Sequence, residues 1–336
     1  MKILVTGGLG FIGSHTVVSL VQHGHEVVII DNLSNSSLDV LDNIASIIGE
    51  KPEFHQIDVR DKKQLAKFFE AHQDIEGCIH FAASKAVGES VEKPLHYYQN
   101  NTNALVYLLK ELVKIPRCGL IFSSSCTVYG QADQLPITED APVKKAESPY
   151  GNTKQISEEI IQDTTKVSDL QAISLRYFNP IGAHESAKIG ELPKGKPQNL
   201  VPFITQTAIG IRKELSVFGD DYPTDDGTCI RDYIHVVDLA EAHVVAVERL
   251  VDHKNKGQFE VFNVGTGKGN SVLEVVKAFE RSTGEKLPYK IADRRSGDVV
   301  AAYADTTKAN LELGWKAKLT LEDALKSAWK WEQSLH

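Results

Sequence analysis

The fold is decided by the stretch Thr6-Gly7-Gly8-Leu9-Gly10-Phe11-Ile12-Gly13 near the start of the chain. It follows a β-branched run at residues 2–6 and opens a segment of helical periodicity at residues 11–22. Glycines at positions 7, 10 and 13 leave the backbone free of side chains, so a pyrophosphate can approach the amides and the positive dipole end of a helix. A glycine-rich turn alone is common, but its place between a strand and a helix predicts a dinucleotide-binding fold.

An acidic residue follows at the expected distance. The next predicted strand, residues 26–30, runs into Asp31, and the interval from Gly13 to Asp31 is close to the roughly 20 residues typical of an acid that binds a ribose 2′-hydroxyl. The Asp31 carboxylate would repel a 2′-phosphate and no arginine directly follows it, so the pattern favours NAD over NADP. The alternative is a structural turn in which Asp31 only caps a helix. Asp58-Val59, after the third strand, is either a contact to the adenine or a plain turn.

Short β-branched runs and segments of helical periodicity alternate through the first half of the chain. Strands are predicted at residues 2–6, 26–30, 53–58, 78–81, 119–123 and 172–177, and helices at 11–22, 38–48, 62–71 and 95–113. Another helix starts at Ser148-Pro149, where serine can cap and proline suits the first turn. This alternation predicts an α/β fold with a Rossmann-type, doubly wound parallel sheet that is covered by helices on both faces.

The pattern changes after residue 178. Residues 179–197 are rich in glycine, proline and charged side chains and are predicted to form a long loop. Helices are expected at about residues 199–213, 238–251, 271–282, 306–313 and 321–333, with only short strands between them. We therefore expect an NAD-binding domain over residues 1–178 and a smaller, mostly helical C-terminal substrate domain over residues 179–336. No linker marks this soft boundary, so the chain can cross back between the two.

Composition excludes several classes of protein. The 336 residues carry 37 lysines and arginines against 45 acidic residues, for a net charge of −8, and no basic stripe suggests a nucleic-acid surface. No apolar run approaches the roughly 18 residues that cross a bilayer, and the first residues lack the apolar stretch of a secretory signal. The four cysteines form no C-x-x-C pair and cannot build a disulfide scaffold for a chain of this length. We expect a soluble, cytoplasmic, globular protein.

Three side chains are predicted to meet at the sheet edge and carry chemistry. The fifth strand ends in Ser123-Ser124-Ser125, and Tyr150 and Lys154 are spaced so that they share one face of the following helix. A lysine ammonium near a phenol stabilises the phenolate and lowers the phenol's pKa, which makes Tyr150 a candidate acid or base at neutral pH. A serine at the strand end can hydrogen-bond the same substrate hydroxyl. The set indicates hydride transfer at a carbinol carbon; the alternative is an NAD-binding protein without chemistry.

The glycine motif, the serine cluster and the Tyr150–Lys154 pair resemble the extended short-chain dehydrogenase/reductase superfamily. Within it, longer stretches resemble the UDP-galactose 4-epimerase family, and the resemblance runs over about residues 2–333. These stretches are Asp31-Asn32-Leu33-Ser34-Asn35, residues 80–94 (HFAASKAVGESVEKP), 122–130, 176–184 (RYFNPIGAH), 218–235 and 263–272. They are far more specific than a glycine-rich loop.

The resemblance implies an isomerase that interconverts UDP-glucose and UDP-galactose. Tyr150 would take the proton of the sugar 4-hydroxyl, Lys154 would hold the phenolate and the nicotinamide ribose, and Ser125 would bridge the 4-oxygen. Hydride from C4 would pass to tightly bound NAD, giving a 4-keto sugar that swings over within the site before hydride returns, without stereospecificity, to its other face. The family also implies a homodimer, formed through the helices at about residues 95–113 and 149–166.

The same resemblance assigns contacts to individual positions. Those expected to contact NAD, with the glycine turn included, are Gly7, Gly10, Phe11, Ile12, Gly13, Asp31, Asn32, Asn35, Asp58, Val59, Phe81, Ala82, Lys85, Asn100, Ser123, Tyr150, Lys154 and Tyr177. Those expected to contact the nucleotide sugar are Lys85, Ser125, Tyr150, Phe178, Asn179, Asn199, Leu200, Val217, Phe218, Arg231, Tyr233, Arg295, Asp298 and Ala302. Independently, Arg231 and Arg295 could neutralise a diphosphate, because the guanidinium fork suits phosphate oxygens, and Asp298 could accept from a ribose hydroxyl. The alternative for these arginines is a solvated surface.

Position 302 departs from part of the family in a way that bears on specificity. Members confined to glucose and galactose carry a bulky tyrosine there, beside the C2 substituent of the sugar, whereas members that also accept N-acetylated sugars carry a small residue. This chain has Ala302, so we expect it to interconvert UDP-GlcNAc and UDP-GalNAc as well. The alternative is that Tyr303 or a displaced loop fills the space. Ser84 and Cys126 also differ from the residues expected at their positions.

Other activities of the same fold are weaker alternatives. A sugar-nucleotide 4,6-dehydratase needs an acidic pair just after the strand-end serine, where this chain has Cys126-Thr127. A reductase would prefer NADPH, and the Asp31 carboxylate argues against binding of that cofactor. A non-catalytic NAD sensor would not require a serine, a tyrosine and a lysine kept together. The twelve histidines form no H-E-x-x-H motif, so no metal is expected.

Overall fold

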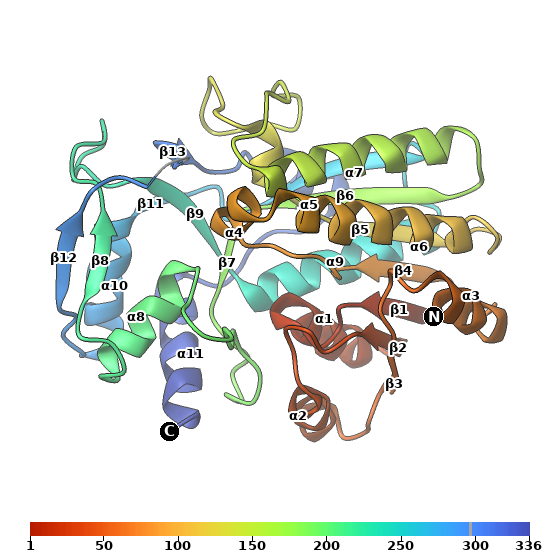
Figure 1. Cartoon of the computed structure of the whole chain (residues 1–336), viewed down its shortest axis with the longest axis horizontal. Helices are drawn as coiled ribbons and strands as arrows, with labels where there is room; N and C mark the ends of the chain where they lie inside the picture. Colours follow the sequence, from red (N-terminus) through yellow and green to blue (C-terminus); the bar gives the residue numbers. More distant parts are fainter. Residues whose placement is uncertain (296–297) are drawn as a thin grey trace.

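A seven-stranded sheet forms the centre of the structure, a computed structural model that describes residues 1–295 and 298–336. The strand order is β3-β2-β1-β4-β5-β6-β10, and every pair of neighbours is parallel (Figure 1). The strands are β1 (Lys2–Thr6), β2 (Glu26–Asp31), β3 (Glu53–Gln56), β4 (Gly77–His80), β5 (Gly119–Ser125), β6 (Gln171–Tyr177) and β10 (Phe259–Val264). This order confirms the predicted doubly wound, Rossmann-type sheet, in which ligands bind where the winding reverses, between β1 and β4.

Helices cover both faces of the sheet because successive strand residues point into two different apolar cores. Ile3 and Val5 of β1 belong to one core, and Leu4 between them belongs to the other. The helices of the first face are α1 (Phe11–Gln22), α2 (Leu38–Ile48) and α9 (Val236–Val251); those of the second are α3 (Lys62–Ala71), α6 (Ala104–Leu112) and α7 (Pro149–Lys166). The two layers lie on opposite sides of the strands in Figure 1. Burial on both faces explains why β1 and β2 carry continuous apolar runs, residues 3–5 and 27–30, rather than alternating polar residues.

The helix predicted over residues 95–113 is interrupted in the structure. It consists of α5 (Pro94–Tyr97), a π-helical turn (Tyr98–Asn103) and α6, and a short helix that was not predicted, α4 (Val87–Glu92), precedes it. The π turn is anchored to α7, where the Asn152 side-chain amide donates to the Tyr98 hydroxyl at 2.7 Å. Such turns inside α-helices are frequent at functional sites, and this one carries Asn100, a predicted cofactor contact.

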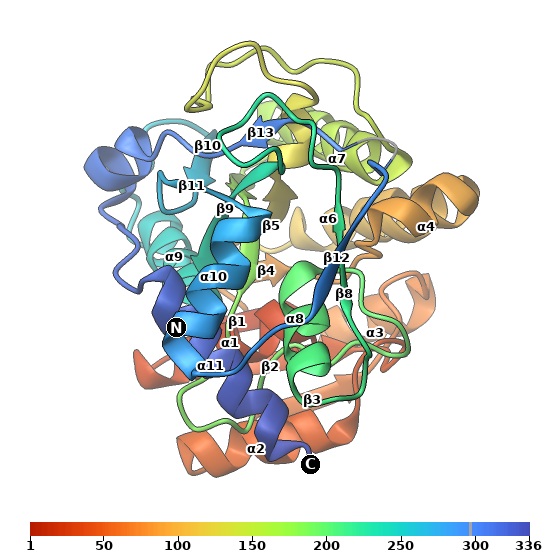
Figure 2. The ribbon, with the colours of Figure 1, turned by 90° about the vertical axis from the view of Figure 1, so that its left-hand side faces the viewer.

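A smaller lobe packs against the carboxyl edge of the large sheet (Figures 1 and 2). It has its own apolar core, which includes Ile204, Phe279 and Trp329. Its helices are α8 (Leu200–Ala208), α10 (Val272–Thr283) and α11 (Leu321–Ser334), and its strands are β7 (Asn179–Ile181), β8 (Leu215–Phe218), β9 (Ile230–His235), β11 (Gly269–Ser271), β12 (Tyr289–Ala292) and β13 (Ala301–Ala302). β9 is central, with β7 and β13 parallel to it and β11 antiparallel, while β8 pairs with β12.

The chain returns to the first lobe after residue 235. α9 packs on the large sheet, and β10 extends that sheet by pairing with β6, Phe259 opposite Ala172 and Val264 opposite Tyr177. Residues on the C-terminal side of the expected boundary therefore build part of the Rossmann-type layer. The soft boundary at residue 178 left this possibility open, and the physical reason is that β6 would otherwise leave an unpaired edge.

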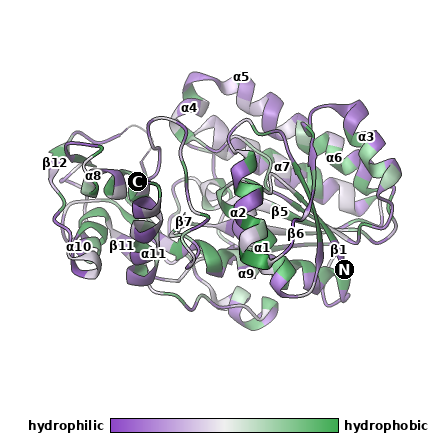
Figure 3. Ribbon diagram, turned by 90° about the horizontal axis from the view of Figure 1, so that it is seen from below, coloured by the Kyte–Doolittle hydropathy of each residue, from purple (hydrophilic) through white to green (hydrophobic). Residues whose placement is uncertain are grey.

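Hydropathy follows this layering. Apolar residues gather on the strands of the large sheet, and α10 and α11 alternate between hydrophilic and hydrophobic positions (Figure 3). Each of these two helices starts with a complete capping box, Ser271 with Glu274 and Thr320 with Asp323, so the sequence marks their first residues clearly. Within residues 1–295 and 298–336, no helix is both long and apolar enough to cross a membrane.

Candidate active site

The glycine turn brings β1, α1 and the loop after β4 into close contact. Gly7 has a φ of +71°, and a Cβ atom on it would lie 2.8 Å from the Ala82 amide nitrogen. A Cβ atom on Gly13 would lie 2.3 Å from the Gly7 carbonyl oxygen. Gly10 is the N-cap of α1 and makes no side-chain cap, so the first amides of the helix are offered outward. Only glycine fits at positions 7 and 13, and the cradle that results suits a pyrophosphate.

Asp31 ties the end of β2 to the glycine turn. Its buried carboxylate accepts from the Leu9 amide at 3.1 Å, from the Leu33 amide at 2.9 Å and from the Ser36 hydroxyl at 2.8 Å. These three bonds hold the carboxylate at the carboxyl edge of the sheet, where the sequence places the ribose. A role limited to capping a helix does not fit, because the carboxylate bonds to the glycine turn as well as to its own loop.

The Asp58 carboxylate is engaged in hydrogen bonds from two neighbouring side chains. It accepts from the Arg60 guanidinium at 2.9 and 2.6 Å and from the Asn32 side-chain amide at 3.0 Å. The hydrogen bonds from Arg60 hold the pKa of Asp58 well below its usual range, and the Asn32 bond acts in the same direction. Asp58 therefore orients Asn32, a predicted cofactor contact, while Val59 next to it is part of the apolar core.

The loop after β4 completes the edge of the sheet. The Phe81 amide donates to the Thr6 carbonyl at 2.9 Å, which keeps Phe81 and Ala82 beside the glycine turn. The Phe81 ring lies 4.7 Å from the ring of His243 on α9. Burial lowers the pKa of His243 to about 4, so this imidazole is neutral at pH 7.

Ser125, Tyr150 and Lys154 are brought together as predicted from the sequence. Ser125 is the last residue of β5, and Tyr150 and Lys154 lie in the first two turns of α7, whose N-cap Ser148 accepts from the Gly151 amide. All three side chains are buried. The Lys154 ammonium lies 5.8 Å from the centre of the Tyr150 ring, and the Ser125 hydroxyl accepts from the Thr127 amide at 3.2 Å.

The pKa values of Tyr150 and Lys154 in the protein alone differ from those that the sequence predicts. Burial raises the pKa of Tyr150 to about 12, and the hydrogen bond from Ser125 offsets this only in part. Burial also lowers the pKa of Lys154 to about 8, with Glu158 acting in the opposite direction. The expected lowering of the phenol pKa by the ammonium is not seen, because burial is the largest influence on the phenol; the Lys154 ammonium donates to the Ser123 carbonyl at 2.5 Å. Burial is therefore the largest influence on the pKa of both Tyr150 and Lys154 in the protein alone.

Ser123 and Tyr177 face each other at the ends of β5 and β6, and their hydroxyls are hydrogen-bonded. Below them, Glu158 pairs with Arg176 at 2.5 Å and accepts from the hydroxyls of Ser124 and Ser174 at 2.6 and 3.0 Å. These buried polar groups are mutually satisfied, which fixes the strand ends that carry the site.

The π turn faces Ser84, one of the departures from the family. The Asn100 amide donates to the Ser84 hydroxyl at 3.0 Å, and the Asn101 side chain accepts from the Ser84 amide at 2.8 Å. The Asn101 amide in turn donates to Thr153 on α7 at 3.1 Å. The hydroxyl at position 84 thus holds the predicted cofactor contact Asn100 next to the catalytic helix.

Glu191 is a site residue that motif reasoning missed. It lies in the loop between β7 and α8, and its carboxylate accepts from Lys85 at 3.0 Å and from the Asn199 side-chain amide at 2.6 Å. Both partners are predicted ligand contacts, and they come from different lobes. Nearby, the Lys194 ammonium donates to the carbonyls of Leu33, Ser34 and Ser36 at 3.0–3.3 Å and so holds the loop after Asp31. The only feature of the sequence that could have pointed to Glu191 and Lys194 was the high content of charged residues in this loop.

Two arginines of the smaller lobe share one carboxylate. Arg295 donates to the two oxygens of Asp298 at 2.9 and 3.2 Å, and the Arg231 guanidinium lies 3.6 Å from the same carboxylate. The Arg295 guanidinium also stacks over Phe218, 5.0 Å from the ring centre. Two positive groups share one negative group, which leaves an excess of positive charge. This excess favours a role in binding a diphosphate over the alternative, a solvated surface without a ligand.

Ala302 lies next to this cluster. It pairs with Arg231 in the β13–β9 ladder and is 8% exposed, within an apolar group that includes Phe178, Val128 and Tyr129. Of the remaining predicted contacts, Asn179 pairs with Tyr233 between β7 and β9, Val217 and Phe218 end β8, Asn199 and Leu200 begin α8, and Asn35 is exposed in the loop after β2.

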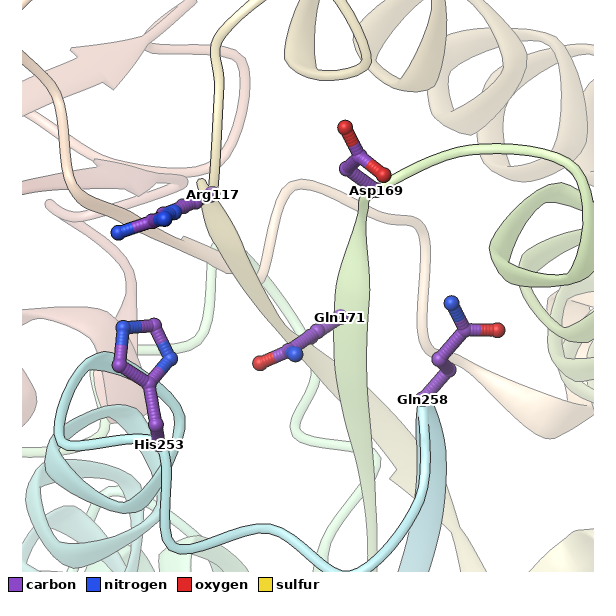
Figure 4. A pocket seen from close by; sticks show the side chains of 5 residues that line it. All are labelled: Arg117, Asp169, Gln171, His253 and Gln258. Carbon is purple, nitrogen blue, oxygen red and sulfur yellow. The ribbon is translucent and has the colours of Figure 1, made fainter.

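A polar hollow of about 490 Å³ lies at the opposite edge of the large sheet (Figure 4). It is lined by Arg117, Asp169, Gln171, His253 and Gln258, next to the amino ends of β5, β6 and β10. Ligands of doubly wound sheets bind at the carboxyl edge, and none of the predicted site residues lines this hollow.

Comparison with known proteins agrees with the fold and identifies the family. A family model described as GDP-mannose 4,6 dehydratase matches residues 4–328 of this chain. The UDP-glucose 4-epimerase of Bacillus subtilis is 50% identical over 335 residues, which cover 99% of this chain and 97% of that protein. At half identity over nearly the full length, the similarity is to epimerases in particular.

Solved structures show the same arrangement. The UDP-glucose-4-epimerase from Stenotrophomonas maltophila, determined with bound NAD and formylated UDP-arabinopyranose, matches with a TM-score of 0.95 and 47% identity over 100% of this chain and 98% of that one. The UDP-Glc/GlcNAc 4-epimerase from Campylobacter jejuni matches with a TM-score of 0.84 and 36% identity over 99% of both chains.

Proposed function

The chain belongs to the UDP-glucose 4-epimerase family of the extended short-chain dehydrogenase/reductase superfamily, and from that premise we propose that it interconverts UDP-glucose and UDP-galactose with resident NAD. The observation that carries the proposal is the convergence of Ser125, Tyr150 and Lys154 beside a glycine turn that accepts no Cβ atom at positions 7 and 13. A protein that only senses NAD gains nothing from this buried polar set.

The residues that would hold NAD fit it by shape and charge. Gly7 and Gly13 make room for the pyrophosphate, and Asp31 is positioned to accept from a ribose hydroxyl and to repel a 2′-phosphate. When bound at this edge, NAD supplies a reversible acceptor of hydride. Asn32, Phe81 and Asn100 surround the same edge and are the proposed contacts to the rest of the dinucleotide.

The protein's own groups handle the proton. Tyr150 takes the proton of the sugar 4-hydroxyl as C4 is oxidised and returns it when C4 is reduced on the opposite face. Ser125, whose hydroxyl acts to lower the pKa of the phenol, shares the 4-oxygen in this proposal. Lys154 supplies a buried positive charge 5.8 Å from the centre of the Tyr150 ring, which favours the phenolate while the proton is transferred.

The smaller lobe recognises the nucleotide part of the substrate. Arg231 and Arg295 are the proposed ligands of the diphosphate, with Asp298 exchanging its ion pairs for a ribose hydroxyl. Lys85 and Asn199 would be released from Glu191 when the substrate enters between the lobes.

A second activity, the interconversion of UDP-GlcNAc and UDP-GalNAc, is favoured by Ala302. The methyl group at this position leaves room for an acetamido group beside Phe178, whereas a phenol ring would occupy it. Tyr303 is directed elsewhere, because its ring packs against Gly269 of β11. The relative from Campylobacter jejuni described as a UDP-Glc/GlcNAc 4-epimerase has the same fold as this chain. We further propose a homodimer and a cytoplasmic location, both of which stay predictions.

One experiment tests both activities. The purified protein is incubated separately with UDP-galactose and UDP-GalNAc, without added cofactor, and the 4-epimers are separated by chromatography. Conversion of both supports an epimerase with resident NAD and an open pocket at Ala302, and Ala302→Tyr should then lose the N-acetyl reaction alone. Conversion of UDP-galactose only would leave the first proposal and overturn the second. If neither reacts even after NAD is supplied, the proposed activity is wrong.

A further inference from the structure

Two histidines and a glutamate converge far from the active site. Glu53 and His55 lie on the edge strand β3, and His72 is the residue that ends α3. One ligand atom from each of the three side chains lies within 4.8 Å of the others. In Figure 1, β3 and α3 are at the end of the molecule away from the smaller lobe. No step of the proposed reaction uses these groups.

The donor atoms already point at one another. The Glu53 carboxylate oxygen Oε1 lies 2.7 Å from His55 Nε2 and 2.9 Å from His72 Nε2. Glu53 and His55 are two residues apart on β3, so their side chains leave the strand on the same face.

The proton of His72 is fixed on the nitrogen that faces away from Glu53. His72 Nδ1 lies 2.7 Å from the Phe68 carbonyl oxygen, which can only accept, so Nδ1 carries a hydrogen. In the neutral imidazole, Nε2 therefore presents a lone pair to a carboxylate oxygen that also has only lone pairs to offer. A cation between the two atoms turns this mismatch into two coordinate bonds. An Nδ1–H bonded to a backbone carbonyl is also the usual support for a metal-binding histidine.

The two imidazoles are held in place before any ion arrives. The His72 ring is buried and stacks on Phe68 with 4.1 Å between ring centres and an angle of 15°. The His55 ring meets both neighbours edge-on, at 5.1 Å from Phe68 and 5.2 Å from His72. Neither ring has to leave its packing for its Nε2 atom to bind a metal.

We propose that Glu53, His55 and His72 form a Zn²⁺ site that ties the edge strand β3 to the end of α3. Two imidazole nitrogens and one carboxylate oxygen are a common protein ligand set for zinc, with water in the fourth position. Nitrogen ligands argue against Ca²⁺ and Mg²⁺, which prefer oxygen alone. Bonds of about 2.0–2.1 Å in a tetrahedron separate donor atoms by about 3.3 Å, so the half-exposed Glu53 side chain has to withdraw by roughly half an ångström.

The site is a structural tie rather than a second reaction centre. β3 is the outermost strand of the large sheet and pairs only with β2 among the described residues, so a cross-link to α3 secures an otherwise weakly held edge. The sequence analysis expected no metal because the ligands follow no linear motif. Two come from alternate positions of a strand and the third from a helix end, and only the packing of α3 on the sheet brings them together.

Zinc titration of the full-length protein tests the proposal. The protein, freed of metals with EDTA and dialysed, is titrated with ZnCl₂ in a calorimeter. We expect one saturable site per chain, and Glu53→Gln, His55→Gln and His72→Gln should each weaken Zn²⁺ binding at least about tenfold, since loss of a supporting second partner alone costs 10–100-fold. His25→Gln is the matched control, because the His25 ring also faces a carboxylate, that of Glu248 at 2.9 Å, but none of the residues that the structure describes joins them as a third ligand.

Two further readouts keep the test decisive. Co²⁺ in place of Zn²⁺ should give the intense visible absorption of a four-coordinate ion, and Zn²⁺ should raise the melting temperature of the wild type and of His25→Gln but not of His55→Gln. Circular dichroism checks folding, and the partly exposed positions 53 and 55 keep the result interpretable if the buried His72 variant misfolds. No saturable binding by the wild type, or unchanged binding in Glu53→Gln and His55→Gln, would overturn the proposal. The proposal would also be overturned if His25→Gln weakened Zn²⁺ binding as much as Glu53→Gln and His55→Gln do.

Discussion

The two sides of the active site differ in how their polar groups are held. On the Rossmann-type side, the protein satisfies its own site residues: Asp31 accepts three hydrogen bonds, and Lys154 donates to the Ser123 carbonyl. On the side of the smaller lobe, the cations predicted to bind substrate are paired with acidic side chains, Lys85 with Glu191 and Arg295 with Asp298. The cofactor edge is therefore preorganised, whereas the substrate side has to exchange partners when a ligand enters.

The largest effect is expected at the catalytic tyrosine. Tyr150→Phe removes the proton carrier but keeps the ring in its buried place, so kcat should fall by about 10²–10⁴-fold while NAD stays bound. The measurement is epimerisation of UDP-galactose, with the NAD content of the purified protein as the control. Activity within tenfold of the wild type would revive the interpretation as a non-catalytic NAD protein.

The preorganised edge is tested next at Asp31. Asp31→Asn replaces one oxygen by an amide group that cannot accept, so either the Leu9 amide or both the Leu33 amide and the Ser36 hydroxyl lose their partner inside the protein. An unsatisfied buried donor costs about 1–3 kcal/mol, and NAD should bind roughly tenfold to a hundredfold more weakly. The fraction of protein that retains NAD through purification measures this. Asp39→Asn, on the exposed first turn of α2, should retain NAD as the wild type does.

Lys154 connects catalysis with stability and gives a pH signature. In the folded protein without NAD, burial lowers its pKa from 10.5 to about 8, so burying the ammonium opposes folding. This destabilisation is fully present below pH 8 and fades as the pH rises from about 8 to 10.5, because the unfolded chain then binds more protons than the folded one. Lys154→Met should therefore be more stable than the wild type by about 1–3 kcal/mol at pH 7, and the gap should close towards pH 10.

Denaturant unfolding of the NAD-free proteins across this pH range checks the sign. Lys166→Met, at the exposed end of the same helix, should change the free energy of unfolding by no more than about 0.5 kcal/mol. A wild type that is more stable than Lys154→Met at pH 7 would show that the bond to the Ser123 carbonyl outweighs the cost of burial. Lys154→Met should in any case have little epimerase activity.

The smallest effect is expected on the substrate side. If Glu191 competes with substrate for Lys85 and Asn199, then Glu191→Ala should lower KM for UDP-galactose by a few-fold with little change in kcat, since a half-exposed ion pair contributes about 0–1 kcal/mol. Glu185→Ala, an exposed position in the same loop, serves as the control. A rise in KM would mean that Glu191 positions its partners for the substrate instead.

Some elements of this protein could be predicted residue by residue. β1 and the helices α1, α2 and α3 begin and end where the periodicity and the flanking glycine, serine and aspartate residues indicate. These signals are local, because strand alternation, helical spacing and caps act within a few residues. The doubly wound parallel sheet, with a candidate site at its carboxyl edge, followed from the alternation of elements, which allows few topologies.

Other features depend on contacts between residues far apart in the chain. Nothing near residues 259–264 indicates that they form the last strand of the large sheet, since that requires the free edge of β6. The π turn at residues 98–103 has no distinct local pattern and reflects its packing against α7 and Ser84. The Glu191 bridge and the Glu53–His55–His72 cluster likewise join elements that no linear motif connects.

The sequence by itself determined the class of fold and predicted a dinucleotide site and a proton carrier, because glycine conformational freedom, strand and helix periods and residue chemistry are local properties. Only the tertiary structure decided the pKa values of the site residues and their hydrogen-bond partners. Tyr150 illustrates the division: its spacing from Lys154 was visible in the sequence, but only the fold shows that burial raises its pKa to about 12 and that the ammonium donates to the Ser123 carbonyl. Desolvation and long-range hydrogen bonds exist only once the chain has folded.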